Sequence, residues 1–63
     1  MKKNKIIKEV KFSYCDKTYK LGPFVDFIAE LEVPSYEYEA IVHKIEEINP
    51  EYEEIKIMSF RHG

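Results

Sequence analysis

The segment 35–49 constrains the fold more than any other part of the chain, because it carries the clearest periodicity. Plotted at about 100° per residue, its apolar side chains fall within an arc of about 120°, as in a helix that lies on a sheet. These residues are Tyr38, Ile41, Val42, Ile45 and Ile48. Pro34 keeps the preceding residue extended, Ser35 suits an N-cap, and Pro50 ends the helix. We therefore predict a helix over residues 35–49.

The N-terminal part of the chain has the alternation of a β-strand over residues 5–14. Ile6, Val10, Phe12 and Tyr14 would share one face, interrupted by Lys8, while Ile7, Glu9, Lys11 and Ser13 would share the other. Residues 15–17 form a short polar break, and residues 18–21 resume extended character. The pattern predicts a β-hairpin, although its turn lacks the Asn-Gly or Asp-Gly pair typical of the tightest hairpins.

Gly22-Pro23 is expected to interrupt the sheet, and the segment that follows fits two structures. As a helix, residues 24–33 would align Phe24, Phe27, Ile28 and Leu31. As a strand, Val25, Phe27, Ala29, Leu31 and Val33 would make one face wholly apolar. The strand is favoured because the segment is rich in Phe, Val and Ile. A last strand is predicted over residues 55–60, so that strand, helix and strand form a crossover, normally right-handed.

These elements predict one α+β domain over residues 1–63, in the order β-β-β-α-β. The sheet would be mostly antiparallel, with the helix covering one face. A chain of 63 residues buries only about 60% of the surface that its unfolded form exposes, so we expect a homodimer to supplement its thin core. The single cysteine excludes an internal disulfide. No signal peptide or membrane span of about 20 apolar residues is expected, and the predicted compartment is the cytoplasm.

The charge is divided unevenly along the chain. Residues 1–21 hold seven lysines and two acids, a net charge of +5, whereas residues 22–63 hold three basic residues and ten acids, a net charge of −7. The overall charge is −2. Such asymmetry informs on partners more than on fold.

The residue types that catalysis and metal binding require are sparse. Cys15 with His43 or His62 could serve as nucleophile and base, but a strand-end cysteine and two surface histidines are far more common. One cysteine and two histidines do not have the spacing of a zinc site. With only two glycines, the chain has no glycine-rich phosphate loop. The prediction is a protein that is not an enzyme and needs no metal or cofactor.

The acidic residues around the helix and its connector are the first candidate site. A non-enzymatic adaptor or inhibitor could dock a partner that has a basic surface there, with tyrosines as anchors. The candidate residues are Tyr36, Glu39, His43, Glu46, Glu47, Glu51, Tyr52, Glu53 and Glu54. The plain alternative is a solvated helix face.

The basic hairpin is the second candidate, as a nucleic-acid-binding regulator. Lysines neutralise phosphates and aromatic rings stack on bases in single-strand-binding proteins. The candidate residues are Lys8, Lys11, Phe12, Tyr14, Lys17, Tyr19 and Lys20. The plain alternative is that these lysines keep a strand edge soluble. The Lys-, Glu- and Ile-rich composition resembles that of small accessory proteins of phages and mobile elements, but no motif supports that resemblance.

Overall fold

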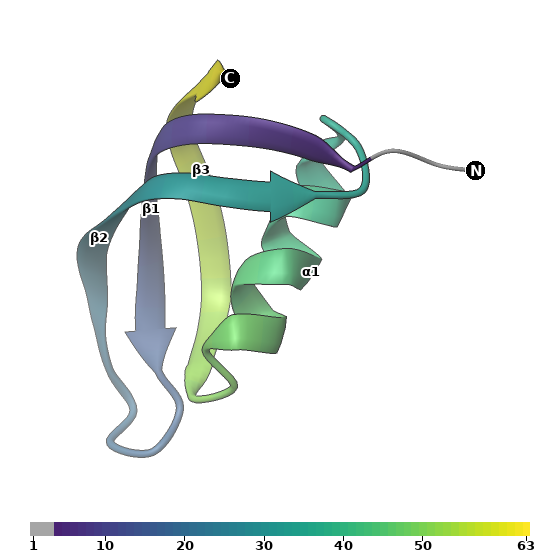
Figure 1. The fold of residues 1–63 in the computed structure, drawn as a ribbon. Coiled ribbons are helices and arrows are strands. Elements are labelled where there is room, and N and C mark those ends of the chain that lie inside the picture. Colours follow the sequence, from purple (N-terminus) through teal and green to yellow (C-terminus); the bar gives the residue numbers. More distant parts are fainter. Residues whose placement is uncertain (1–3) are drawn as a thin grey trace.

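A computed structural model describes residues 4–63 of the chain. It contains three strands and one helix, β1 (Lys5–Asp16), β2 (Leu21–Val33), α1 (Tyr38–Ile48) and β3 (Tyr52–His62) (Figure 1). The strand order in the sheet is β2-β1-β3, and both pairings are antiparallel. β2 and β3 therefore run parallel to each other on either side of the central β1. The α+β class is confirmed.

The order of elements is β-β-α-β, so one predicted strand boundary is wrong. Gly22 and Pro23 lie inside β2, where the prediction placed a break between two strands. Tyr14 pairs with Phe24 and Asp16 with Leu21, so β2 carries one extra residue here and forms a β-bulge. A Cβ on Gly22 would lie 3.0 Å from the Cα of Cys15, and its φ of 135° suits glycine. The interruption is thus a local bulge within a continuous strand.

The hairpin between β1 and β2 closes over residues 17–20. Asp16 begins this turn, and its Oδ1 accepts a hydrogen bond from the backbone N–H of Tyr19 at 2.9 Å. Lys20 has a φ of 54°, in the left-handed region. The hairpin is confirmed, but residues 18–20 belong to its turn and were predicted as strand.

A bend in β1 changes which face of the strand is buried. Ile7, Val10 and Phe12 are all fully buried, although Val10 is three positions after Ile7, an odd spacing that places two residues of a regular strand on opposite faces. Glu9 lies between them with a φ of 52°, which turns the strand by one position. The regular alternation predicted for residues 5–14 is therefore wrong on one side of Glu9, because Ile7 and not Ile6 faces the core.

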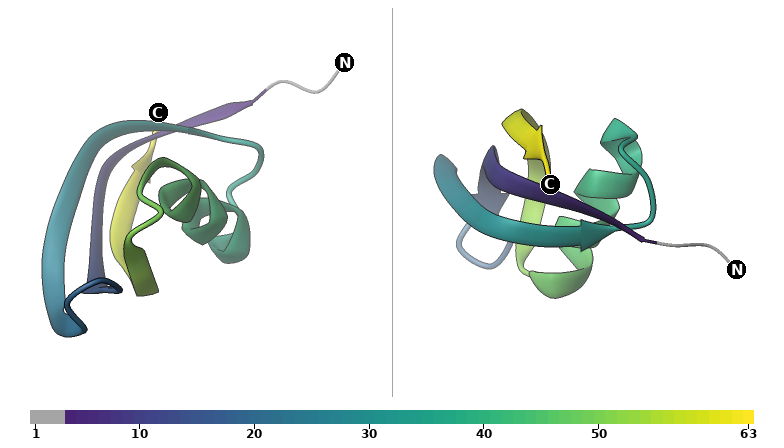
Figure 2. Two further views of the ribbon diagram at one scale, coloured as in Figure 1. Left: turned by 90° about the horizontal axis from the view of Figure 1, so that it is seen from below. Right: turned by 45° about the horizontal axis from the view of Figure 1, so that its top comes forward.

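The neighbouring strands change face at the same level. In β2, Leu31 and Val33 are buried, whereas Val25 and Phe27 are 57% and 56% exposed. The continuous apolar face predicted for this strand is therefore split between core and solvent. In β3, the register against β1 shifts around Met58. All three strands thus bend together, and the sheet curls around the helix (Figure 2).

Helix α1 lies on the concave side of the bent sheet, and its buried side chains belong to the core (Figure 2). Ile41 and Ile45 are fully buried, whereas Tyr38 and Ile48, at the ends of the predicted stripe, are 52% and 49% exposed. The core consists of Ile7, Val10, Phe12, Leu31, Val33, Ile41, Ile45 and Ile55. The predicted helix register is confirmed at the centre of the stripe.

The helix is shorter at its start than predicted. Its N-cap is Glu37, which makes no side-chain capping hydrogen bond. The Oγ of Ser35 instead accepts a weak hydrogen bond from the N–H of Glu37 at 3.3 Å, so Ser35 lies two residues before the N-cap position. The end is close to the prediction, because Asn49 is the C-cap and its N–H donates to the carbonyl of Ile45.

Both outer strands have a backbone N–H that bonds to a side chain of the same chain. In β2, the N–H of Phe27 donates to the Oδ1 of Asp26 at 2.7 Å. In β3, the N–H of Ile57 donates to the hydroxyl of Tyr38 on the helix at 3.2 Å. Each bond occupies a donor that an added strand would need.

The bend at Glu9 can be tested with a β-branched residue, which tolerates positive φ poorly. We expect Glu9→Val to lower the free energy of unfolding by about 1 kcal/mol, because a β-branched side chain at positive φ adds steric cost to that which glutamate already carries. Urea denaturation measures the change. Lys11→Val is the matched control, since Lys11 is exposed on the same strand without a positive φ, and it should cost little. Equal losses in the two variants would contradict a strained bend at Glu9.

The helix packing can be tested with two isoleucines from the same predicted stripe. Ile45→Asp places a charge in the core, where desolvation costs several kcal/mol, and should abolish cooperative thermal unfolding. Ile48→Asp changes the same residue type at a half-exposed position and should retain a cooperative transition. Circular dichroism melts distinguish the two outcomes. A cooperative melt of Ile45→Asp near the parent temperature would show that the helix register is wrong.

Candidate binding surfaces

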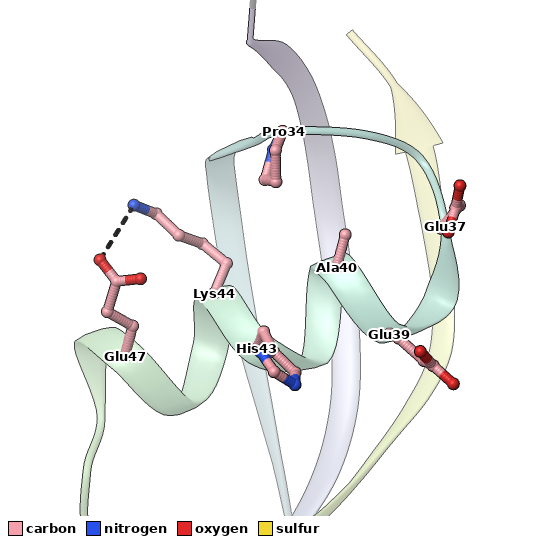
Figure 3. Close-up of a pocket in the computed structure, with 7 residues that line it drawn as sticks. All are labelled: Pro34, Glu37, Glu39, Ala40, His43, Lys44 and Glu47. Carbon is pink, nitrogen blue, oxygen red and sulfur yellow. Dashed lines mark ion pairs between the residues drawn. The ribbon is translucent and has the colours of Figure 1, made fainter.

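The outer side of α1 carries a cluster of acidic residues beside a shallow hollow. The hollow lies between the helix and the segment that precedes it, and Figure 3 shows the side chains around it. Its lining residues are Pro34, Glu37, Glu39, Ala40, His43, Lys44 and Glu47. Glu46 is exposed on the same helix. We call Glu37, Glu39, His43, Glu46 and Glu47 the acidic helix face.

The acidic helix face contributes little to the stability of the fold. Glu46 and Glu47 lie in the last turn, where the helix dipole is negative and where no basic residue is present. Carboxylates at this end lower the stability of the helix. The cost is about half a kcal/mol for each, similar in size to the gain from a favourable charge at a helix end. Lys44 offsets part of this cost, since its Nζ lies 3.7 Å from the Oε1 of Glu47. Such exposed pairs stabilise a protein by less than about 1 kcal/mol.

The two tyrosines of the predicted acidic surface do not lie on the acidic helix face. Tyr36 stacks on His62 near the end of β3, with ring centroids 4.1 Å apart and an interplanar angle of 11°. Tyr52 is half-buried and packs against the core. The tyrosine anchors predicted for this surface are therefore occupied by contacts within the chain.

The connector acids of the predicted surface are also dispersed. The carbonyl of Glu51 accepts a hydrogen bond from the N–H of Lys17 at 2.8 Å, which ties the connector to the hairpin turn. Glu53 pairs with Cys15, and Glu54 has a φ of 51° at the bulge beside that pair. These two acids therefore sit at the far end of β1.

Tyr52 is the centre of a small polar and aromatic cluster on the concave side of the sheet. Its hydroxyl donates to the Oδ2 of Asp26 at 3.2 Å, and its ring stacks on Tyr14 with centroids 3.7 Å apart. Phe12 and Phe24 lie at the margins of this pair. Desolvation, the Tyr14 hydroxyl and the Asp26 carboxylate raise the pKa of Tyr52 well above its usual value near 10. Because these residues come from all three strands, the cluster holds the strands together and has a structural role.

The residues of the predicted basic hairpin do not form one surface. Phe12 is fully buried and has no surface to offer a nucleobase. Tyr14 is half-buried in its stack with Tyr52. Lys17, Tyr19 and Lys20 are exposed in the turn, and Lys8 is exposed at the bend. Like Lys8, Lys11 is exposed on the central strand, where it pairs with residues of both outer strands.

The neighbours of Lys11 form a face that could be found only from the strand register. Residues paired across antiparallel strands point to the same side of a sheet. Lys11 pairs with Phe27 and Ser59, and Ser13 pairs with Val25 and Lys56. A shallow hollow on this side is lined by Glu9, Lys11, Phe27, Ser59, Phe60 and Arg61. We call Lys11, Ser13, Val25, Phe27, Lys56 and Ser59 the outer sheet face.

The candidate nucleophile and the histidines lie apart. Cys15 is at the end of β1, His43 is on the outer side of α1, and His62 pairs with Ile7 near the start of β1. Desolvation and the nearby carboxylate of Glu54 raise the pKa of the Cys15 thiol, which keeps it protonated at neutral pH. Over residues 4–63, no three Cys, His, Asp or Glu side chains are grouped as metal ligands.

Within the described chain, α1 is too short and too polar to cross a membrane, and no other helix is present. Comparison of the sequence and structure with protein-family models, curated proteins and solved structures finds no match.

The Tyr52 cluster predicts a specific loss of stability in alkaline solution. The unfolded chain releases the tyrosine proton near pH 10, whereas the fold retains it because its pKa is raised. The unfolded state then binds fewer protons, so stability falls as the pH rises above about 10. Urea midpoints at about pH 9 and pH 11 should differ less in Tyr52→Phe than in the parent. Tyr19→Phe, in the exposed turn, is the control and should behave as the parent. Equal pH dependence in all three proteins would contradict a raised pKa of Tyr52 in the folded state.

Proposed function

We propose that the protein is a small non-enzymatic binding module, an adaptor or inhibitor, whose acidic helix face docks a partner with a basic surface. The observation that carries this proposal is the placement of Glu46 and Glu47 in the last helical turn. They lie where carboxylates oppose the helix dipole, and Glu46 has no basic neighbour at the helix end. Residues that cost local stability are often retained for function.

The shape and charge of the surface also support docking. The hollow beside His43 lies between acids at both ends of the helix, with Glu37 and Glu39 at the start and Glu47 near the end (Figure 3). A basic side chain of a partner could enter it with carboxylates on two sides. Without the tyrosine anchors, charge is the main source of recognition. Such recognition acts mostly on the rate of association.

The proposal also includes self-association and a cytoplasmic location, which both stay predictions. A homodimer would add buried surface to a core of eight side chains. Symmetric pairing of β2 with a second β2 would bring Asp26, Glu30 and Glu32 of both copies together, which disfavours that edge.

The test removes three charges from the acidic helix face by Glu39→Gln, Glu46→Gln and Glu47→Gln. The parent protein is used to capture the partner from the native host, and the partner is then purified for kinetic measurement. We expect the triple variant to bind at least tenfold more weakly, a loss of about 1.4 kcal/mol. For the parent, raising the salt from about 50 to about 500 mM should slow association far more than it speeds dissociation.

The matched control removes three carboxylates elsewhere, by Glu30→Gln, Glu32→Gln and Glu54→Gln. It changes the net charge equally but leaves the helix untouched, and it should bind like the parent. An unchanged affinity in the helix variant, or an equal loss in the control, would mean that the acidic helix face is only solvated. Thermal melts of both variants establish that the fold is intact.

A further inference from the structure

The outer sheet face has the opposite character to the acidic helix face. It combines two exposed apolar side chains on β2, Val25 and Phe27, with exposed lysines on β1 and β3. A ring that is 56% exposed on a sheet face has no role in the core. From this combination we infer that the outer sheet face binds single-stranded nucleic acid, independently of the partner proposed for the helix.

The strand register places the groups at suitable distances. Phe27 pairs directly with Lys11, so their Cβ atoms are about 5 Å apart on the same face. Ser59 continues this row on β3, and the next row runs from Val25 through Ser13 to Lys56. A base that stacks on Phe27 would leave its phosphates over the lysines of the neighbouring strands. Aromatic stacking beside a positively charged track is how proteins bind single strands without reading their sequence.

Acidic residues border this face at both ends, since Glu30 pairs with Lys8 and Glu53 pairs with Cys15, next to the row that contains Lys56. Glu9, which lines the hollow beside Lys11, is bound to Arg61 by a hydrogen-bonded ion pair. The acidic helix face lies on the concave side, with the sheet between it and the lysines (Figure 2). A polyanion on the convex side would therefore be separated from the helix carboxylates by the sheet.

The exposed ring favours a single strand over a duplex. The bases of a duplex are stacked on one another, so they cannot reach Phe27 without being extruded, which costs a few kcal/mol per base. The lysines would attract either form through its phosphates. The contribution of Phe27 therefore distinguishes the two ligands, whereas the contributions of Lys11 and Lys56 do not.

The experiment measures fluorescence anisotropy of a labelled oligothymidylate of about 12 nucleotides at about 50 mM salt. We expect saturable binding by the parent protein. Lys11→Gln and Lys56→Gln should each weaken it and reduce the slope of log K against log salt by about 0.7. Phe27→Leu should weaken binding about fivefold or more with an unchanged slope, and Phe27→Tyr should retain it, because only the aromatic ring can stack.

The matched control is Lys44→Gln, which removes the same charge from the helix side and should leave binding unchanged. Four results would overturn the inference: no anisotropy change up to about 100 μM protein, an effect of Lys44→Gln equal to that of Lys11→Gln, full binding by Phe27→Leu, or equal affinity for a duplex of the same length.

Sedimentation of the same proteins tests whether a second copy of the chain occupies the outer sheet face instead. A dimer that Lys11→Gln dissociates, without oligonucleotide binding, would assign the face to self-association. Since the helix carboxylates are not changed, failure here leaves the proposed function standing.

Discussion

The bend at Glu9 is the constraint on which the rest of the structure depends. If the three strands formed a flat sheet, one short helix would cover only the middle of that sheet. The apolar side chains at the ends of the strands would then be exposed to solvent. Because β1 changes face between Ile7 and Val10, both halves of the strand direct apolar side chains towards the helix. The neighbouring strands bend at the same level, so Leu31 of β2 closes the core from the other side. A chain of this size thereby surrounds Ile41 and Ile45 on several sides.

Much of the fold could be predicted from the sequence, because helix register and hairpin pairing depend on local patterns. The centre of the helix followed from the spacing of Ile41 and Ile45, and its end followed from Pro50. The change of face in the strands could not be predicted in the same way. It requires a glutamate with positive φ, which that residue type adopts rarely. The one feature of the sequence that marks this change of face is Lys8, which breaks the apolar alternation just before the bend.

The candidate surfaces differ in how far the sequence could define them. The acids on the outer side of α1 could be found because they lie opposite an apolar stripe in the same helix. The tyrosines could not be placed, since Tyr52 bonds to Asp26, 26 residues away, and Tyr36 stacks on His62. The outer sheet face depends on pairing between Lys11 and Phe27, which composition does not reveal. Division of the chain into a basic and an acidic half also obscured this face, because β1 lies at the centre of the sheet.

The two side-chain bonds at the strand edges have a consequence for the protein at high concentration. A sheet with two free edges can in principle grow into a fibre, as each copy adds strands to the next. Here the amide of Phe27 is held by Asp26 on one edge, and the amide of Ile57 is held by Tyr38 on the other. At these two positions an added strand would find no free donor, so a continuous ladder of hydrogen bonds between copies is interrupted. The structure thus limits, at one point on each edge, the pairing through which copies of a sheet join.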